Sequence, residues 1–253
     1  MPAFAINLTW AFTEYPLMDR FEKAARAGFA GVELHSPYDA PAQAIRNECL
    51  RHGLEFVVMN SPPPNYTGGA PGDAAVPGLE ARFQQDFKRS LRYAGVLGAA
   101  HLHLVAGDVE GEAARATYIK NLTWAADHAP GQSLVIEPLN AVDHPGYFLS
   151  DFHMAREIIA EVDRPNVRLE FDAYHAQVIH GDAVALWDEM RDISALVQVA
   201  QTPHRHEPDK GEIDHPAFFA QLAREGFEGW VSGEYHPASH TVKGLGWLPP
   251  ETC

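Results

Sequence analysis

The sequence predicts a single (β/α)₈ barrel, and three observations lead to that fold class. Short runs rich in Val, Ile, Leu and Phe alternate with longer amphipathic stretches, which is typical of a parallel sheet covered by helices. Eight such runs occur, the number that closes a barrel, and a chain of 253 residues has the usual length of that fold. The expected strands are Ala3 to Leu8, Gly31 to His35, Leu54 to Asn60, His101 to Ala106, Ser133 to Pro138, Val167 to Asp172, Leu196 to Ala200 and Trp230 to Tyr235.

Glycines mark the ends of four expected helices, because glycine readily adopts the left-handed conformation that stops a helix. These helices are Pro16 to Arg26, Pro41 to His52, Leu79 to Leu97 and Ala217 to Glu225. No linker, low-complexity segment or charge block divides the chain, so residues 1–253 are expected to form one TIM-barrel domain. Two irregular segments remain. They are a loop of about residues 61–78, long enough to act as a lid or binding loop, and a tail of about residues 237–253.

The chain is acidic and otherwise of ordinary globular composition. It is 46% hydrophobic and 21% charged, and 19 Lys and Arg against 34 Asp and Glu give a formal net charge of −15. Such a surface repels phosphate backbones and anionic lipid, so we expect neither a nucleic acid nor a membrane as partner. Cys49 and Cys253 form no disulfide framework or thiolate metal motif, and the chain begins without a basic or long apolar leader. A cytoplasmic protein is therefore expected.

Four consecutive expected strands carry an oxygen-bearing side chain near their carboxyl ends. Glu137, Asp172, Gln198 and Glu234 are spaced 35, 26 and 36 residues apart, about one β/α unit each. Active sites of such barrels lie at the carboxyl ends of the strands, so the four should share one rim. A single carboxylate there is as often a helix cap or a solvated charge, but four in succession favour a site. Oxygen donors without thiolate suit one Mg²⁺ or Mn²⁺ ion, and three close carboxylates need a cation.

The chain resembles the hydroxypyruvate isomerase family, within the xylose isomerase-like barrels that also include the ketose 3-epimerases. The likeness covers nearly the whole chain. Its most distinctive pieces are Arg205-His206-Glu207-Pro208 and Gly244-Leu245-Gly246-Trp247-Leu248. The other matching segments are Asn7-Leu8, Phe12-Thr13-Glu14, Ala27-Gly28-Phe29, Gly31-Val32-Glu33, Pro37-Tyr38-Asp39, Ile136-Glu137-Pro138, Pro145-Gly146-Tyr147-Phe148, and Asp172 with Tyr174-His175.

This resemblance implies an isomerase, an intramolecular oxidoreductase that interconverts hydroxypyruvate and tartronate semialdehyde through an enediolate. It implies that Glu137, Asp172, Gln198 and Glu234 hold the metal, and that Glu137 and Glu234 form the proton-transfer pair. The chemistry agrees, because moving a carbonyl between adjacent carbons requires taking a proton from one carbon and returning it to the other. No nucleotide or redox cofactor is expected, since the glycine pairs of the chain lack the Lys-Ser/Thr sequence of phosphate loops.

Six further side chains are expected to line the substrate pocket. Arg205 can hold a carboxylate through two hydrogen bonds, and His175 lies three residues after a predicted metal ligand. The competing interpretations are an ion pair of Arg205 with Glu207 or Asp209, and a supporting hydrogen bond for His175. Ordinary structural roles compete evenly for the remaining four. The full set is His175, Arg205, His103, Glu33, Asn7 and Tyr66.

The substrate identity is the least determined part of this prediction, because the departures from the family pattern surround the expected pocket. His35 and Ser36 stand where more apolar residues are expected, and His236 follows the last strand. A four-carbon 2-oxo acid or a ketose 3-epimerase substrate fits the same chemistry as hydroxypyruvate. An abasic-site endonuclease would need a histidine-rich zinc rim and a basic surface, and a non-catalytic ligand-binding barrel would need no metal. The sequence also leaves room for a small homo-oligomer.

Overall fold

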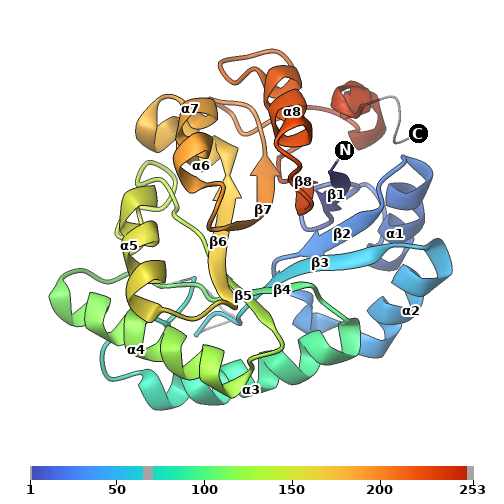
Figure 1. Cartoon of the computed structure of the whole chain (residues 1–253). Coiled ribbons are helices and arrows are strands. Elements are labelled where there is room, and N and C mark those ends of the chain that lie inside the picture. The colour runs from blue at the N-terminus through green and yellow to red at the C-terminus, as the bar shows by residue number, and fades with distance from the viewer. Residues whose placement is uncertain (1, 65–70, 250–253) are drawn as a thin grey trace.

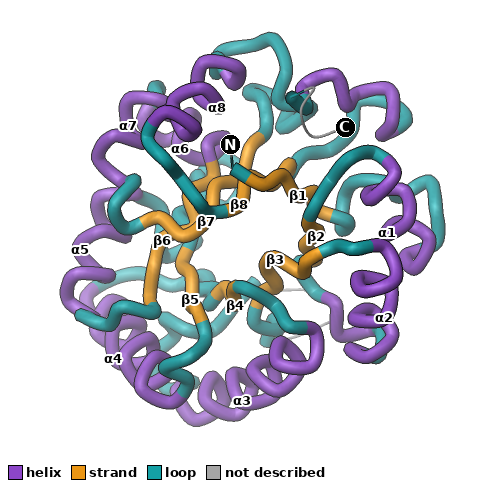
Figure 2. The backbone as a smooth tube through the Cα atoms, turned by 45° about the vertical axis from the view of Figure 1, so that its right-hand side comes forward, coloured by secondary structure: helices purple, strands orange, loops and turns teal. Residues whose placement is uncertain are grey.

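Eight parallel strands form a closed barrel in which β1 is hydrogen-bonded to both β2 and β8 (Figure 1). The computed structural model describes residues 2–64 and 71–249. Viewed along the barrel, the helices form an outer layer around the ring of strands (Figure 2), which confirms the predicted fold. The strands are β1 (Ala3–Asn7), β2 (Gly31–Leu34), β3 (Glu55–Asn60), β4 (His101–His103), β5 (Ser133–Ile136), β6 (Val167–Asp172), β7 (Ser194–Val199) and β8 (Trp230–Gly233).

The four helices with glycine stops agree with prediction to within two residues at each end. Gly53 and Gly98 end their helices with φ of 67° and 71°, in the left-handed region where an added Cβ would be strained. The helices are α1 (Leu17–Arg26), α2 (Ala42–His52), α3 (Glu80–Leu97), α4 (Glu112–His128), α5 (Phe152–Val162), α6 (Ala173–His180), α7 (Ala183–Met190) and α8 (His215–Arg224), with short 3-10 helices η1 (Pro37–Asp39) and η2 (Thr241–Trp247).

Apolar side chains close the barrel at the amino-terminal ends of its strands, and we call this cluster the floor. Its members come from strands that are not neighbours, so they meet only inside the barrel. Gly31 begins β2 and makes room for them, because an added Cβ would lie 2.7 Å from the Trp230 ring and 2.8 Å from Val57 Cγ2. The floor consists of Ala5, Val57, Val58, Val135 and Leu196, with Trp230 packed against them.

The fourth strand is shorter than predicted, ending at His103 instead of Ala106. Beyond it, the carbonyl groups of Val105 and Ala106 accept hydrogen bonds from Ala74 and Ala75, at 3.2 and 2.8 Å, so the long loop replaces a neighbouring strand. Ala74 and Ala75 are fully buried. The second half of the predicted 61–78 loop is therefore part of the packed structure. Its residues 65–70 lie outside the described part of the chain.

The tail that follows β8 is more ordered than the sequence predicted, because it contains η2. The Thr241 backbone N–H donates to Glu14 Oε1 at 2.8 Å, and its hydroxyl donates to Glu14 Oε2 at 3.0 Å. Trp247 Nε1 donates to the Tyr235 hydroxyl at 3.2 Å. These contacts fix the described tail to the loop after β1 and to the end of β8. Within residues 2–64 and 71–249, no helix has the length and apolarity needed to cross a bilayer.

Candidate active site at the carboxyl ends of the strands

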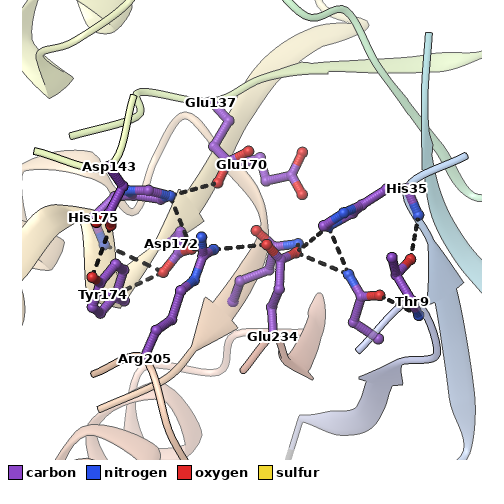
Figure 3. Close-up of polar contacts among 12 residues, drawn as sticks. Thr9, His35, Glu137, Asp143, Glu170, Asp172, Tyr174, His175, Arg205 and Glu234 are labelled. Atoms are coloured by element: carbon purple, nitrogen blue, oxygen red, sulfur yellow. Dashed lines mark hydrogen bonds and ion pairs between the residues drawn. The ribbon is translucent and has the colours of Figure 1, made fainter. Parts of the chain in front are cut away.

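The four predicted oxygen donors lie together at the carboxyl end of the barrel, which we call the mouth (Figure 3 labels three of them). Asp172 and Gln198 are register partners on β6 and β7, while Glu137 and Glu234 each follow directly after a strand, β5 and β8. None of the four is more than 6% exposed. Consecutive parallel strands thus bring side chains up to 97 residues apart into one buried polar cluster.

Glu234 is surrounded by donors. Its Oε2 accepts a 3.1 Å hydrogen bond from Asn7 Nδ2 and a short one from Gln198 Nε2, and it lies 3.2 Å from His35 Nε2. Its Oε1 accepts from Arg205 Nη2 at 2.7 Å. Burial acts to raise the pKa of this carboxyl, but His35 and Arg205 outweigh burial and hold the pKa below its usual value. Glu234 is therefore ionised at neutral pH.

Glu137 has few partners. His103 Nδ1 is 3.7 Å from Oε2 and His175 Nε2 is 3.9 Å from Oε1, both beyond hydrogen-bonding distance. Oε1 is buried and makes no hydrogen bond. Burial raises the pKa of this carboxyl well above its usual value, and the charges of Glu170 and Glu234 raise it further. Without a bound cation, Glu137 thus readily holds a proton.

Arg205 supplies the positive charge of the mouth. Its Nη2 donates to Asp172 Oδ2 at 2.6 Å as well as to Glu234, so the competing prediction of an ion pair with Glu207 or Asp209 is wrong. The rings of Trp10 and Tyr174 lie 4.7 and 5.0 Å from the guanidinium carbon. Nε is buried without a hydrogen bond, and the backbone φ of 53° is strained for an arginine. The strained loop and the two aromatic rings thus hold the guanidinium in place, and its Nε–H has no hydrogen-bond partner.

The tautomer of His175 follows from its contacts. The backbone N–H of Asn140 can only donate, and it lies 3.1 Å from His175 Nδ1, so Nδ1 must be the acceptor nitrogen. Burial lowers the pKa of His175 well below its usual value, so the ring is neutral and its proton is on Nε2. His175 Nε2 lies with oxygens of Glu137 and Asp172 in a group that could hold a metal ion. A protonated nitrogen cannot coordinate a cation, so this histidine is a donor and not a ligand.

The donor set fits a hard divalent cation. Gln198 Nε2 faces carboxylate oxygens of Glu33 and Glu234, which orients the amide, and its Oε1 is buried without a partner. Oε1 of Glu137 is likewise unpartnered. Burial raises the pKa of Asp172 to about 6 even with Arg205 beside it, as expected for carboxylates that lack sufficient positive charge. Glu137, Asp172, Gln198 and Glu234 could therefore hold Mg²⁺ or Mn²⁺ through oxygen alone.

Three of the other predicted pocket residues lie in the same cluster, deeper than expected. Glu33 Oε1 accepts from Gln198 at 3.1 Å, and Asn7 reaches Glu234, so both support other side chains. His103 is 2% exposed, and burial lowers its pKa to about 3, so it is a neutral group beside Glu137. Tyr66 lies outside the described residues.

Two members of the cluster were missed in the sequence. Glu170 is fully buried with its Oε2 3.5 Å from His103 Nδ1, and burial followed by the charge of Glu234 raises its pKa well above normal. A signal existed, because Glu170 is two residues before Asp172 on one strand and so faces the same side. His35 stands out in the sequence only as a departure from a family pattern. Its contact with Glu234 depends on two strands meeting across the mouth.

Comparisons with known proteins agree with this fold. A family model described as "Xylose isomerase-like TIM barrel" matches residues 21–251. A 2-oxo-tetronate isomerase from Cupriavidus necator is 40% identical over 99% of this chain and 98% of its own length. A hydroxypyruvate isomerase from Escherichia coli is 34% identical over 99% of both chains.

Solved structures extend the likeness. One described as an AP endonuclease, family 2, from Brucella melitensis is 42% identical, covers 98% of both chains and has a TM-score of 0.94. A 3-keto-D-glucoside 4-epimerase from Escherichia coli covers 100% of both chains with a TM-score of 0.80 at 19% identity, which shows a shared fold alone.

Proposed function

Since the chain belongs to the xylose isomerase-like TIM barrel family and is an isomerase, we propose that it moves the carbonyl of a short 2-oxo hydroxy acid between C2 and C3. The first candidate substrate is 2-oxo-tetronate, because relatives from Cupriavidus necator and Haemophilus influenzae at 40% identity carry that substrate in their names. Hydroxypyruvate, which the relative at 34% identity is named for, is the second candidate. Both substrates require the same proton transfer.

The proposal rests on one observation. The mouth contains two buried carboxylates whose surroundings are opposite. Both oxygens of Glu234 are held by donors, whereas Glu137 keeps a buried oxygen without a hydrogen bond. In the direction from the 2-oxo to the 3-oxo acid, Glu234 takes the C3 proton, the hydroxyl proton moves from O3 to O2, and protonated Glu137 gives its proton to C2. Exchange with solvent then removes the proton from Glu234 and restores the one on Glu137. Their roles exchange in the reverse direction. In the chain without a bound ion, the pKa of Glu234 is lowered and that of Glu137 is raised, which matches a base and an acid respectively.

The remaining residues bind and orient the substrate. His175 Nε2–H is buried, unpartnered and directed between Glu137 and Asp172, so it can donate to the substrate oxygen that gains charge during enediolate formation. Arg205 holds the substrate carboxylate through the donors it does not use for Asp172 and Glu234. Asn7 and Gln198 keep the Glu234 carboxylate in place, so its reacting oxygen approaches from a fixed direction.

A divalent ion completes this site. Glu137, Asp172, Gln198 and Glu234 would hold Mg²⁺ or Mn²⁺, and the ion would stabilise the negative charge that develops on two neighbouring substrate oxygens. Arg205 Nη2 already bonds to oxygens of Asp172 and Glu234. The ion would therefore share these two carboxylates with the guanidinium, whose remaining N–H donors stay available for an anionic substrate.

Proton exchange tests the proposal directly. Purified protein is incubated in D₂O with 2-oxo-tetronate, hydroxypyruvate or a ketose, with Mn²⁺ or with excess chelator, and followed by proton NMR. We expect conversion of the acids with solvent deuterium incorporated at the carbon that receives the proton, and loss of both by chelation. Folded, Mn²⁺-loaded protein that exchanges no carbon-bound proton of either acid contradicts the proposal.

Two other activities are distinguished in the same preparation. Exchange with the ketose but not with the acids would identify a sugar epimerase. Incision of abasic-site DNA would favour the endonuclease activity for which the similar Brucella melitensis protein is named, although a net charge of −15 opposes DNA binding. Chelator-insensitive ligand binding without turnover would indicate a non-catalytic barrel.

A further inference from the structure

Outside the barrel, where α5, α6 and α7 meet, two histidines and an aspartate converge with a glutamate beside them. Asp151 caps the amino end of α5, His153 is in its first turn, His180 ends α6 and Glu189 lies near the end of α7. We propose that Asp151, His153 and His180 form a second metal site, one that binds a borderline transition-metal ion of the Zn²⁺ type. This site is independent of the proposed function of the mouth.

The spacing of the donor atoms suits such an ion. Bonds of about 2.0 to 2.1 Å at tetrahedral angles place ligand atoms roughly 3.4 Å apart. His180 Nε2 lies 3.3 Å from Asp151 Oδ2, and His153 Nδ1 lies 3.9 Å from Asp151 Oδ1. One donor atom from each residue lies within 4.8 Å of the others. Small side-chain rotations bring all three to bonding distance, and water completes the coordination of an exposed site.

His180 provides an independent indication. Its Nε2 is buried and makes no hydrogen bond, even though a carboxylate oxygen lies 3.3 Å away. The geometry is therefore wrong for an N–H donating to Asp151. A cation between the two groups could instead accept a lone pair from the nitrogen and one from the carboxylate oxygen. A bound cation satisfies both groups at once.

Glu189 orients the second imidazole. His153 Nε2 lies 3.1 Å from Glu189 Oε2, so Nε2 carries the proton and donates to the carboxylate. The neutral ring then presents the lone pair of Nδ1, which is the nitrogen on the Asp151 side. A carboxylate that fixes the tautomer of a metal-bound histidine is the common arrangement in zinc sites. Four residues from three helices thus have complementary roles.

The two sites select different ions. Two imidazoles and one carboxylate favour Zn²⁺, Co²⁺, Ni²⁺ or Cu²⁺, whereas the all-oxygen mouth favours Mg²⁺ or Mn²⁺. An ion between α5 and α6 would join the start of one helix to the end of the next. Because only the folded chain brings these ligands together, binding should raise the melting temperature.

A Zn²⁺ titration by calorimetry, in saturating Mg²⁺ to occupy the mouth, tests the proposal. We expect one equivalent to bind the wild-type chain, and His153→Ala to lose it. Glu189→Gln should weaken binding by about 10-fold to 100-fold, as typical for a carboxylate behind a metal-bound histidine. The matched control is His52→Ala, since His52 Nε2 also lies near a carboxylate, 3.6 Å from Glu48 Oε2, but belongs to no group of three possible ligands among the described residues. It should bind Zn²⁺ as the wild type does.

Location and stability give second readouts. Anomalous scattering at the zinc edge should place an ion between His153 and His180, and Zn²⁺ should raise the melting temperature of wild type and His52→Ala but not of His153→Ala. The proposal is overturned if His153→Ala binds Zn²⁺ with unchanged stoichiometry and affinity, or if the only anomalous peak lies at the mouth. Since His153 is 51% exposed, its alanine variant should fold normally. Neither result depends on isomerase activity.

Discussion

The two ends of the barrel differ in how their buried side chains are paired. At the floor, Ala5, Val57 and Leu196 are fully buried and apolar, and the register partners of Val58 and Val135, namely His101 and Arg168, are hydrogen-bonded. His101 Nδ1 lies 2.8 Å from Ser133 Oγ, and Arg168 donates to backbone carbonyl oxygens of Asp192, Ile193 and Ser194. At the mouth, by contrast, carboxylates are buried beside one another, and single atoms of Glu137, His175, Gln198 and Arg205 lack hydrogen bonds.

This difference separates stability from function. A buried polar atom without a partner costs about 1–3 kcal/mol, so the mouth lowers the stability that the rest of the barrel supplies. Unpaired buried groups of this kind are typical of sites where a substrate or an ion supplies the missing partner. Substitutions that change side-chain volume at the floor should therefore lower stability, and substitutions that change the functional group at the mouth should lower activity. Four predictions test that division.

The largest effect is expected at the mouth. Glu137→Gln and Glu234→Gln keep side-chain size but cannot transfer a proton, so turnover of the acid substrate should fall by about 10² to 10⁴. The folded state of Glu137→Gln should persist, since the amide reduces repulsion among the carboxylates. Mn²⁺ content is measured alongside kcat. A variant that keeps more than a tenth of the wild-type rate with unchanged metal removes that residue from the mechanism.

A pH dependence is expected at the floor. Burial lowers the pKa of His101 to about 4, so the folded chain binds fewer protons than the unfolded chain between that value and about 6.5. Stability is then complete above pH 6.5 and decreases as pH falls toward 4, by at most about 3 kcal/mol from this group. His101→Gln should flatten urea-unfolding free energies over that window. An unchanged slope would show that His101 does not titrate this way.

A smaller effect is expected for Arg205→Lys. Lysine keeps the charge but lacks the planar fork, so KM for the acid should rise by about 10-fold to 100-fold. The kcat should fall less than in the glutamine variants, because neither carboxylate is removed. A neutral ketose, if accepted at all, provides the control, since its KM should not respond. Equal changes for acid and ketose would contradict carboxylate binding by Arg205.

The smallest effect tests the floor by volume. Gly31→Ala places a methyl group 2.7 Å from the Trp230 ring, and overpacking of this kind costs about 1–3 kcal/mol. Thermal unfolding should report the loss, while kcat and KM stay at wild-type values. A change in kcat or KM without a change in stability would contradict the view that the floor affects stability and the mouth affects activity.

Much of this architecture was readable from local signals. All eight strands and the four glycine-stopped helices appear where the sequence predicts them, because glycine stops and β-branched runs act over a few residues. The error at β4 arose where the 71–78 segment supplies hydrogen bonds from outside the strand. The placement of Glu137, Asp172, Gln198 and Glu234 at one mouth was also predictable. Their roles as ligands and as a proton-transfer pair remain predictions.

What the sequence determined by itself was periodicity: strand and helix lengths, the number of repeats and the side chains at the carboxyl ends of strands. Only the tertiary structure decided which neighbour each side chain meets. The closing of β8 onto β1, with β2 next to β1, gives Glu234 the donor Asn7 and places His35 beside it, and a strained loop brings in Arg205. Glu137, directly after β5, lies beside His103 and Glu170 instead. The reason is physical, because ionisation depends on charges and dipoles within a few ångströms, and closing the barrel sets those distances.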